Sequence, residues 1–160
     1  MDADRNRERE PHQRTRDRRH HRGPFPAPLG DPARAVRPLT FRLETPGLAL
    51  REMGGEDLAF LAEMLADPEV MRHYPKPLSR AKAAAWIERQ RERYARDGHG
   101  LWLVVRRDGS GPVGQVGLVV QEIDGETLPE IGWMIHRPFW RLGYATEAAL
   151  AVRSAAFGRF

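Results

Sequence analysis

The stretch that decides the fold is WRLGYATEA, which runs from Trp140 to Ala148. Gly143 allows a tight turn, Ala145 keeps the backbone accessible, and the residues that follow favour a helix. The stretch from Glu130 to Ile135 has the apolar, β-branched and aromatic content of a strand. The first N–H groups of a helix lack intrahelical partners, and the helix dipole adds to their attraction for anions. This strand, turn and helix therefore predict a cradle for a phosphate group.

Upstream of the turn, the sequence predicts a domain that begins near residue 39. Residues 48–52 alternate as a strand does, with residues 41–43 as an earlier extension. A helix is expected over 56–65, where acids stand in the first turn and leucines share one face. The Asp-Pro-Glu at 67–69 predicts a short helix from Asp67 to about Arg72. A longer helix is expected from Ser79 to Arg96, with Gly98 beyond its end.

Three further strands are expected before the turn. Residues 101–106 and 113–122 predict two of them, joined by a hairpin at Asp108-Gly109. A second loop at Asp124-Gly125 leads into the strand 130–135. The tryptophans Trp86 and Trp102 are expected to pack in the core.

Composition excludes several classes of protein. A chain of 160 residues can bury one core, and it contains no cysteine, so disulfides, thiolate metal sites and a cysteine nucleophile are excluded. No apolar run reaches the roughly 20 residues that cross a bilayer, and the charged N-terminus has no apolar stretch of the signal-peptide kind. We therefore expect a cytoplasmic protein with no membrane partner, and no metal.

The net charge of +4 is unevenly placed. Residues 1–38 hold ten Arg and six Asp or Glu, whereas residues 39–160 hold 16 basic and 16 acidic residues. The first 38 residues have few apolar side chains and many prolines, which predicts a disordered tail before the domain at 39–160. An arginine-rich arm that touches RNA is the alternative. It is the less favoured one, because acids are interspersed among the arginines and no aromatic residue lies among them.

The residues around the turn resemble one known family. EIGWMI, HRPFW and RLGYATEAAL, residues 130–150, are similar to the fourth strand and acetyl-CoA motif of the GNAT superfamily of N-acetyltransferases, most of all to its ribosomal-protein N-terminal acetyltransferase branch. The family pattern, Gln/Arg-x-x-Gly-x-Gly/Ala, falls on Trp140, Gly143 and Ala145, with Trp140 in place of the usual first residue. The blocks DPEVMRHY at 67–74 and GQVGL at 114–118 extend the resemblance over roughly residues 46–160. It implies an α/β (α+β) fold with a mixed, mainly antiparallel sheet flanked by helices.

The resemblance also implies that this sequence lacks the C-terminal third of the family's domain. Complete members continue past the motif helix with a strand, a helix and two more strands, whereas this sequence stops at Phe160. Without them the strand 130–135 is expected to form an open edge, and edges of that kind invite association. The absent helix often supplies the group that protonates the departing thiolate.

The chemistry implied by the resemblance is transfer of an acetyl group from acetyl-CoA to a primary amine by direct attack. An amine attacks only when neutral, and lysine, with a pKa of about 10.4, needs a base more than a protein α-amine, with a pKa of about 7.7–8.0. Glu130 is the candidate base and Glu122 the second choice. The non-catalytic alternative for Glu130 is a solvated carboxylate at the strand end or a partner of a nearby arginine. His136 is expected to be mainly positional, with a smaller chance of acting as a base.

The resemblance assigns two further groups of residues. The backbone near the end of the strand would meet pantetheine, and the turn would surround the pyrophosphate, with Arg141 adding charge. The acceptor would lie against the loop before the long helix and against one tryptophan of the strand. The expected cofactor-binding residues are Met134, Ile135, His136, Arg141, Leu142, Gly143, Tyr144, Ala145 and Thr146, and the expected substrate-binding residues are His73, Tyr74 and Trp133.

Three functions remain open at this point. The first is an N-acetyltransferase acting on a protein N-terminus or a small amine. The second is a truncated or inactive CoA-binding protein. The third, and least favoured, is an RNA-binding module that uses the basic tail.

Overall fold

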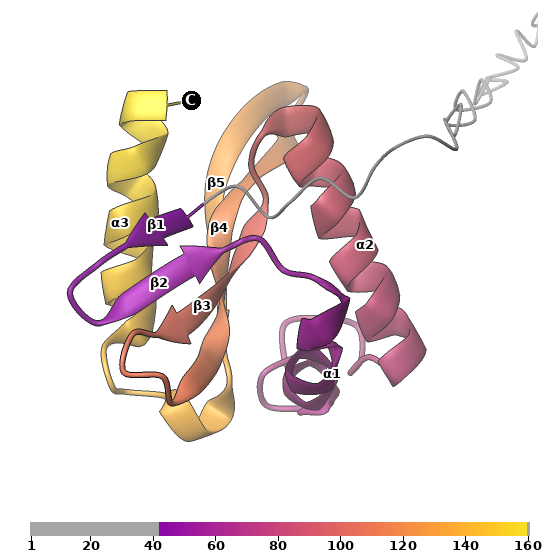
Figure 1. The fold of residues 1–160 in the computed structure, drawn as a ribbon. Helices are drawn as coiled ribbons and strands as arrows, with labels where there is room; N and C mark the ends of the chain where they lie inside the picture. The colour runs from indigo at the N-terminus through magenta and orange to yellow at the C-terminus, as the bar shows by residue number, and fades with distance from the viewer. Residues whose placement is uncertain (1–41, 160) are drawn as a thin grey trace, which may run out of the picture. The chain divides into compact units, whose positions relative to one another are not determined.

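The computed structural model of the chain describes residues 42–159, so the predicted tail lies outside the described residues. Its centre is a five-stranded antiparallel sheet whose strands lie side by side in chain order (Figure 1). The strands are β1 (Arg42–Glu44), β2 (Leu48–Arg51), β3 (Leu101–Arg106), β4 (Gly111–Ile123) and β5 (Glu126–Ile135). The predicted sheet flanked by helices is confirmed.

Helices cover both faces of this sheet. The helical elements are η1 (Gly55–Asp57), α1 (Leu58–Ala66), α2 (Arg80–Asp97), η2 (Arg137–Phe139) and α3 (Tyr144–Arg159). Figure 1 shows α1 and α2 on one side of the sheet and α3 on the other. The buried core includes residues of both helical layers and of the sheet. They are Leu61 and Met64 of α1, Ile87 of α2, Val116 of β4, and Ala148 and Val152 of α3. No helix within residues 42–159 is long and apolar enough to cross a membrane.

Three hairpins explain why chain order equals sheet order. The extension expected at residues 41–43 is a separate strand, β1, which pairs with β2. The turn between β4 and β5 has two residues, Asp124 and Gly125, with φ of 52° and 84°. Two positive φ values are the signature of the type I′ turn, whose twist matches that of the strands it joins. The loop expected at Asp124-Gly125 is therefore a tight hairpin turn, and the hairpin predicted at Asp108-Gly109 joins β3 to β4.

Helix α2 follows its sequence signals closely. The Ser79 hydroxyl accepts a hydrogen bond from the backbone N–H of Lys82 at 3.3 Å, and Gly98 closes the helix in the left-handed region at φ 76°. On the buried face, the Gln90 side-chain oxygen accepts from the backbone N–H of Leu101 at 3.0 Å. This bond joins α2 to the first residue of β3. Trp102 is fully buried, as expected.

The short helix predicted from Asp67 to about Arg72 is wrong, because the chain there forms turns. A single helix-like bond runs from the Met71 N–H to the Asp67 carbonyl, at 3.0 Å. The Asp67 carboxylate accepts from the Glu69 N–H at 2.9 Å and also binds Arg137 at 2.9 Å. Its bond to Arg137 ties this loop to η2, and the prolines at 75 and 77 oppose continuation of a helix.

The strand predicted to begin at Glu130 begins at Glu126 instead. Pro129 lies inside it, opposite Val120. Proline is tolerated there because β5 is the outer strand of the described sheet and residue 129 points its nitrogen away from β4.

Gly117 of β4 lies close to the backbone at the start of β3. A Cβ on Gly117 would lie 1.9 Å from the carbonyl oxygen of Gly100, which itself accepts a hydrogen bond from the Leu118 N–H at 3.1 Å. The obstacle is backbone, so it cannot rotate away. Only glycine fits at this position.

We expect Gly117→Ala to lower the free energy of unfolding by about 3 kcal/mol, because the strands must part to admit the methyl group. The matched control is Gly55→Ala, whose methyl group would meet nothing within 4 Å. That change is expected to stay within about 0.5 kcal/mol. Urea unfolding followed by circular dichroism measures both, and equal losses would contradict the close approach.

Candidate active site

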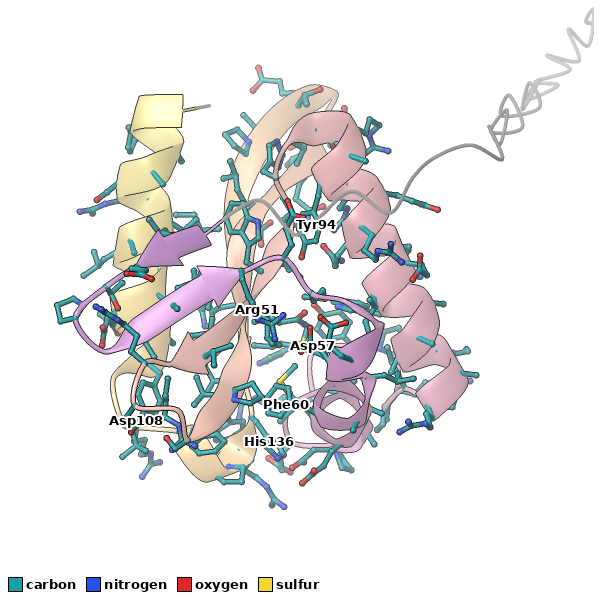
Figure 2. The ribbon with its side chains drawn as sticks, in the orientation of Figure 1. Arg51, Asp57, Phe60, Tyr94, Asp108 and His136 are labelled. Carbon is teal, nitrogen blue, oxygen red and sulfur yellow. The ribbon has the colours of Figure 1, made fainter. Side chains whose placement is uncertain are left out.

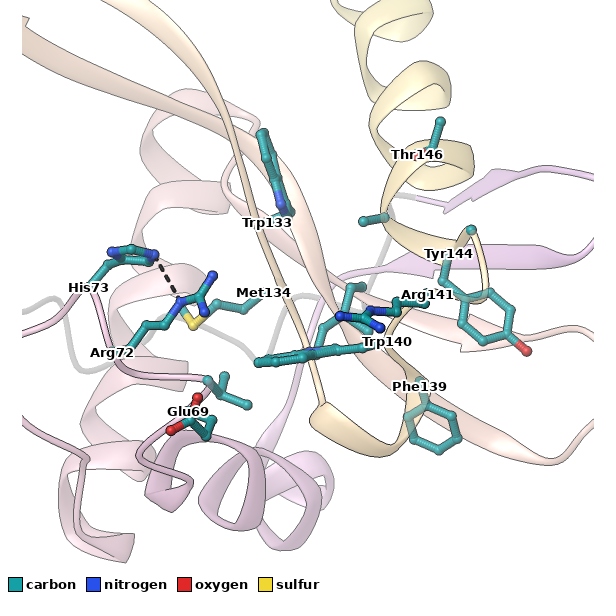
Figure 3. Close-up of a pocket in the computed structure, with 14 residues that line it drawn as sticks. Glu69, Arg72, His73, Trp133, Met134, Phe139, Trp140, Arg141, Tyr144 and Thr146 are labelled. Carbon is teal, nitrogen blue, oxygen red and sulfur yellow. Dashed lines mark hydrogen bonds between the residues drawn. The ribbon is translucent and has the colours of Figure 1, made fainter.

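A pocket of about 350 Å³ lies where the predicted cradle meets the end of β5 (Figure 3). One wall comes from the loop between α1 and α2, a second from β5, and the third from η2, the following turn and the start of α3. Its lining residues are Glu69, Val70, Arg72, His73, Trp133, Met134, Ile135, Phe139, Trp140, Arg141, Gly143, Tyr144, Ala145 and Thr146.

The turn before α3 has the backbone that the sequence predicts. Gly143 has φ 85°, in the region that favours glycine, and a Cβ there would meet nothing within 4 Å. The first hydrogen bond of α3 runs from the Glu147 N–H to the Gly143 carbonyl at 3.0 Å. The N–H groups of residues 144–146 precede that bond, so they have no acceptor within the helix. They belong to three residues that line the pocket, which makes this wall attractive to an anion.

Two charged side chains, those of Arg141 and Glu147, lie near the start of α3. Arg141 lines the pocket and forms no ion pair within the described residues. Glu147 lies in the first turn of α3, but its carboxylate is turned away to the β1–β2 turn. It accepts hydrogen bonds from the Thr45 hydroxyl and from the Gly47 N–H, the latter at 3.0 Å. The negative charge therefore anchors the helix and leaves the cradle net positive.

The outer edge of β5 supplies a row of backbone groups beside the cradle. The His136 N–H donates to the Val113 carbonyl at 2.8 Å, which fixes which residues of β5 face β4. Because this direction alternates along an antiparallel strand, the N–H and C=O groups of Ile131, Trp133 and Ile135 point away from β4. The Ile135 carbonyl is already bound, since the Trp140 indole N–H donates to it at 2.6 Å. The groups of Trp133 remain open next to the pocket.

A series of polar contacts connects Met134, which lines the pocket, to helix α2. The Trp86 indole N–H donates to the side-chain oxygen of Gln115 at 3.0 Å, and the Gln115 amide lies 3.8 Å from the Met134 sulfur. Gln115 is fully buried. These contacts link α2 through β4 to β5 and hold the Met134 side chain in place.

His136 is not among the residues that line the pocket, and its side chain lies beside Phe60 (Figure 2). The imidazole is buried against Phe60, with ring centroids 5.7 Å apart, and against Phe139, at 6.1 Å. Its Nε2 lies 3.3 Å from a Glu63 carboxylate oxygen. Only the backbone of His136 is therefore placed near the end of the β5 edge.

The pocket brings together most of the residues that the sequence assigned to a site. Four assigned residues do not line it. Leu142 is 60% exposed, and Tyr74 is 42% exposed and packs its ring edge against Trp86. Glu130 is exposed on β5, about 13 Å along the strand from Met134. The fourth is His136.

Burial and the negative charge of Glu130 raise the pKa of the Tyr74 phenol, so that carboxylate lies near Tyr74. Glu122, the second choice, accepts from the Thr127 hydroxyl at 2.7 Å and is also exposed.

Sequence reasoning missed two polar residues of the pocket, Glu69 and Arg72 (Figure 3). Glu69 had the appearance of an early acid in a short helix. Because the segment forms turns, Glu69 lines the pocket instead. Within residues 42–159, no group of three or more His, Asp or Glu side chains could hold a metal ion.

We expect Trp140→Phe to lower the free energy of unfolding by about 1 kcal/mol, because the Ile135 carbonyl loses its donor while an aromatic ring is retained. The control is Trp133→Phe, because the Trp133 indole is 60% exposed and makes no hydrogen bond to any residue of 42–159. That change is expected to stay within about 0.5 kcal/mol. Thermal and urea unfolding measure both, and identical behaviour of the two variants would show that the bond is unimportant.

Known proteins resemble this chain over the described domain. It is 34% identical over 111 residues to the uncharacterised protein YkkB of Bacillus subtilis strain 168, an alignment that covers 69% of this chain and 64% of YkkB. An acetyltransferase from Agrobacterium tumefaciens superposes with a TM-score of 0.61 at 25% identity, covering 77% of this chain and 72% of that one. RimL, a ribosomal L7/L12 α-N-protein acetyltransferase, superposes with a TM-score of 0.60 at 13% identity, covering 74% and 66%. The last likeness concerns the fold alone.

The family assignment rests on a match of a different kind. The family model for the acetyltransferase (GNAT) domain matches residues 48–160, which include all the pocket residues and the strand, turn and helix around them. The chain spans less than two thirds of the length of YkkB. The chain belongs to the GNAT acetyltransferase family.

Proposed function

We propose that this chain binds acetyl-CoA and transfers its acetyl group to a primary amine. The observation that carries the proposal is the continuity of two features. Unpaired N–H groups at the start of α3 share one pocket with the outward backbone edge of β5. An anionic group and an amide-bearing arm can therefore bind side by side.

The residues present fit the parts of acetyl-CoA. The N–H groups of residues 144–146 and the Arg141 guanidinium would hold the pyrophosphate. The N–H and C=O groups of Trp133 would pair with amides of the pantetheine arm, next to the backbone of Met134, Ile135 and His136. When bound, acetyl-CoA supplies a thioester carbonyl open to attack by a neutral amine.

The chain's own task is to place and deprotonate that amine. In this proposal His73, Tyr74 and Trp133 border the acceptor. An α-amine is the favoured acceptor, because its pKa of about 7.7–8.0 leaves a useful neutral fraction near pH 7. Direct attack needs no covalent intermediate, which fits the absence of cysteine from the chain.

Two carboxylates are candidates for receiving the proton. Glu130 is the one that the sequence favoured, and its distance from the pocket requires that it act through water next to Tyr74. Glu69 lines the pocket itself. The two differ in reach, so substitution can separate them.

A second candidate function is CoA binding without turnover. The observation that favours it is the open edge of β5. Trp133 is 60% exposed there, over an apolar groove formed with Ala149 and Leu150 of α3. A reacting centre open to water would hold an amine less firmly than a closed one.

We expect Gly143→Val to weaken acetyl-CoA binding by at least about tenfold, because a β-branched residue disfavours φ 85° and the turn must change to relieve it. Gly109→Val is the matched control. Gly109 has φ 83°, a Cβ there would also meet nothing within 4 Å, and it lies in the β3–β4 turn outside the pocket. Calorimetric titration of both variants compares equal backbone strain at two sites. Unchanged affinity in Gly143→Val would refute the cradle.

We expect Glu130→Gln to lower turnover at pH 7 by at least about tenfold with little change in acetyl-CoA affinity. The assay follows release of free CoA thiol with short peptides that carry a free α-amine. Glu69→Gln is measured beside it. A loss in Glu69→Gln alone would move the base to Glu69, and no loss in either variant would show that solvent takes the proton.

A further inference from the structure

The loop between α1 and α2 and the first turn of α2 form a surface of one charge sign. Residues 70–87 contain four basic residues and no Asp or Glu. The four, which we call the basic wall, are all exposed: Arg72, Lys76, Arg80 and Lys82. Opposite this wall, residues 112–136 of β4 and β5 contain no Lys or Arg.

Within the described residues, no ion pair neutralises the charges of the basic wall. Elsewhere in the described chain arginines meet carboxylates, as Arg51 does with Asp57 at 2.8 Å and Arg137 with Asp67 at 2.9 Å. Among the side chains that the structure describes, Arg72 donates only to a ring nitrogen of His73, at 3.1 Å. The first turn of α2 has no acid, although cations there oppose the helix dipole. The wall therefore presents positive charge that a partner could neutralise.

The basic wall begins at the pocket. Arg72 and His73 line it together with Trp133 and Met134 of β5 (Figure 3). From there the chain continues over Lys76 to Arg80 at the start of α2. Glu130 of β5 is exposed, and its negative charge acts on Tyr74, which stands between Arg72 and Lys76 in the chain. A peptide bound there would direct its cationic amine toward Glu130 and its negative groups toward the wall.

We propose that the acceptor is a peptide whose residues after the amino terminus are acidic, and that the basic wall binds those residues. This inference rests on the proposed acetyl transfer and names its substrate class. Arg72 lines the pocket, whereas Lys76, Arg80 and Lys82 do not, so a ligand that meets all four cations must extend beyond the pocket. An extended peptide rises about 3.4 Å per residue, so a segment of six residues can reach from the pocket along the wall.

The test measures binding of two hexapeptides by fluorescence anisotropy in the presence of CoA. Both begin with serine and a free α-amine and carry a C-terminal dye, and one continues with alternating Glu and Asp, the other with alternating Lys and Arg. The full chain is compared with the double variant Lys76→Glu/Arg80→Glu. The matched control is Arg91→Glu/Arg96→Glu, which changes the net charge equally on the later turns of α2, outside the pocket.

The full chain is expected to bind the acidic peptide at least about tenfold more tightly than the basic one at low salt, and less so as ionic strength rises. Lys76→Glu/Arg80→Glu should lose this preference, and the control variant should keep it. Absence of a preference, or equal loss in both variants, would overturn the inference. So would an unstructured 20-nucleotide RNA that binds the wall as tightly as the acidic peptide, because the surface would then attract any polyanion.

Acetylation of the same peptides separates this inference from the function on which it rests. Acetylation of both peptides at equal rates would keep the transferase and remove the acidic specificity. Selective binding of the acidic peptide with no acetylation of its α-amine, while acetyl-CoA is bound, would keep the basic wall as a peptide site and remove the transferase.

Discussion

The pairing of β5 with β4, on one side only, is the constraint on which the site depends. The ladder joins residues 114–123 to residues 126–135 in a fixed register that starts from a two-residue turn. That register decides which backbone groups of β5 are used up by β4 and which face outward. A shift of one residue would make the backbone N–H and C=O groups of Trp133 pair with β4. It would also move the side chain of Met134 to the other face of the sheet. The pocket would then lose both its open backbone groups and its support from Gln115.

The start of α3 is held in place relative to that edge by bonds from distant parts of the chain. Glu147 reaches the β1–β2 turn, and Arg107 reinforces the same turn by donating to the Thr45 carbonyl at 2.8 Å. On the other side, Trp140 binds the last carbonyl of β5. Anchoring the helix through these hydrogen bonds, with its free N–H groups left at the pocket, provides the preorganisation that anion binding requires. The cradle is therefore a property of the whole sheet and not of the glycine turn alone.

The turn around Gly143 could be predicted from the sequence because its causes are local: a positive φ, small residues and a helix that follows. The same holds for α2, whose cap residues Ser79 and Gly98 act as expected. The short helix at Asp67 failed because the Asp67 carboxylate is engaged by Arg137, 70 residues away in the chain, which no local pattern contains. The start of β5 was predicted too late, at Glu130, although Pro129 lies inside the strand. A proline is tolerated there only because the strand lies at an edge, which the local sequence does not reveal.

The candidate site shows the same division. Most of the residues predicted from Met134 to Thr146 line one pocket, His136 and Leu142 being the exceptions. Glu69 was missed, and Glu130 lies outside the pocket, because both positions depend on how the α1–α2 loop packs against β5.

Calorimetric titration of acetyl-CoA into the purified 160-residue chain, with circular dichroism to confirm that it is folded, tests the proposed cofactor site directly. We expect saturable binding of one acetyl-CoA per chain, because the cradle and the open edge of β5 both lie within residues 42–159. A folded chain that does not bind acetyl-CoA would contradict the proposed site.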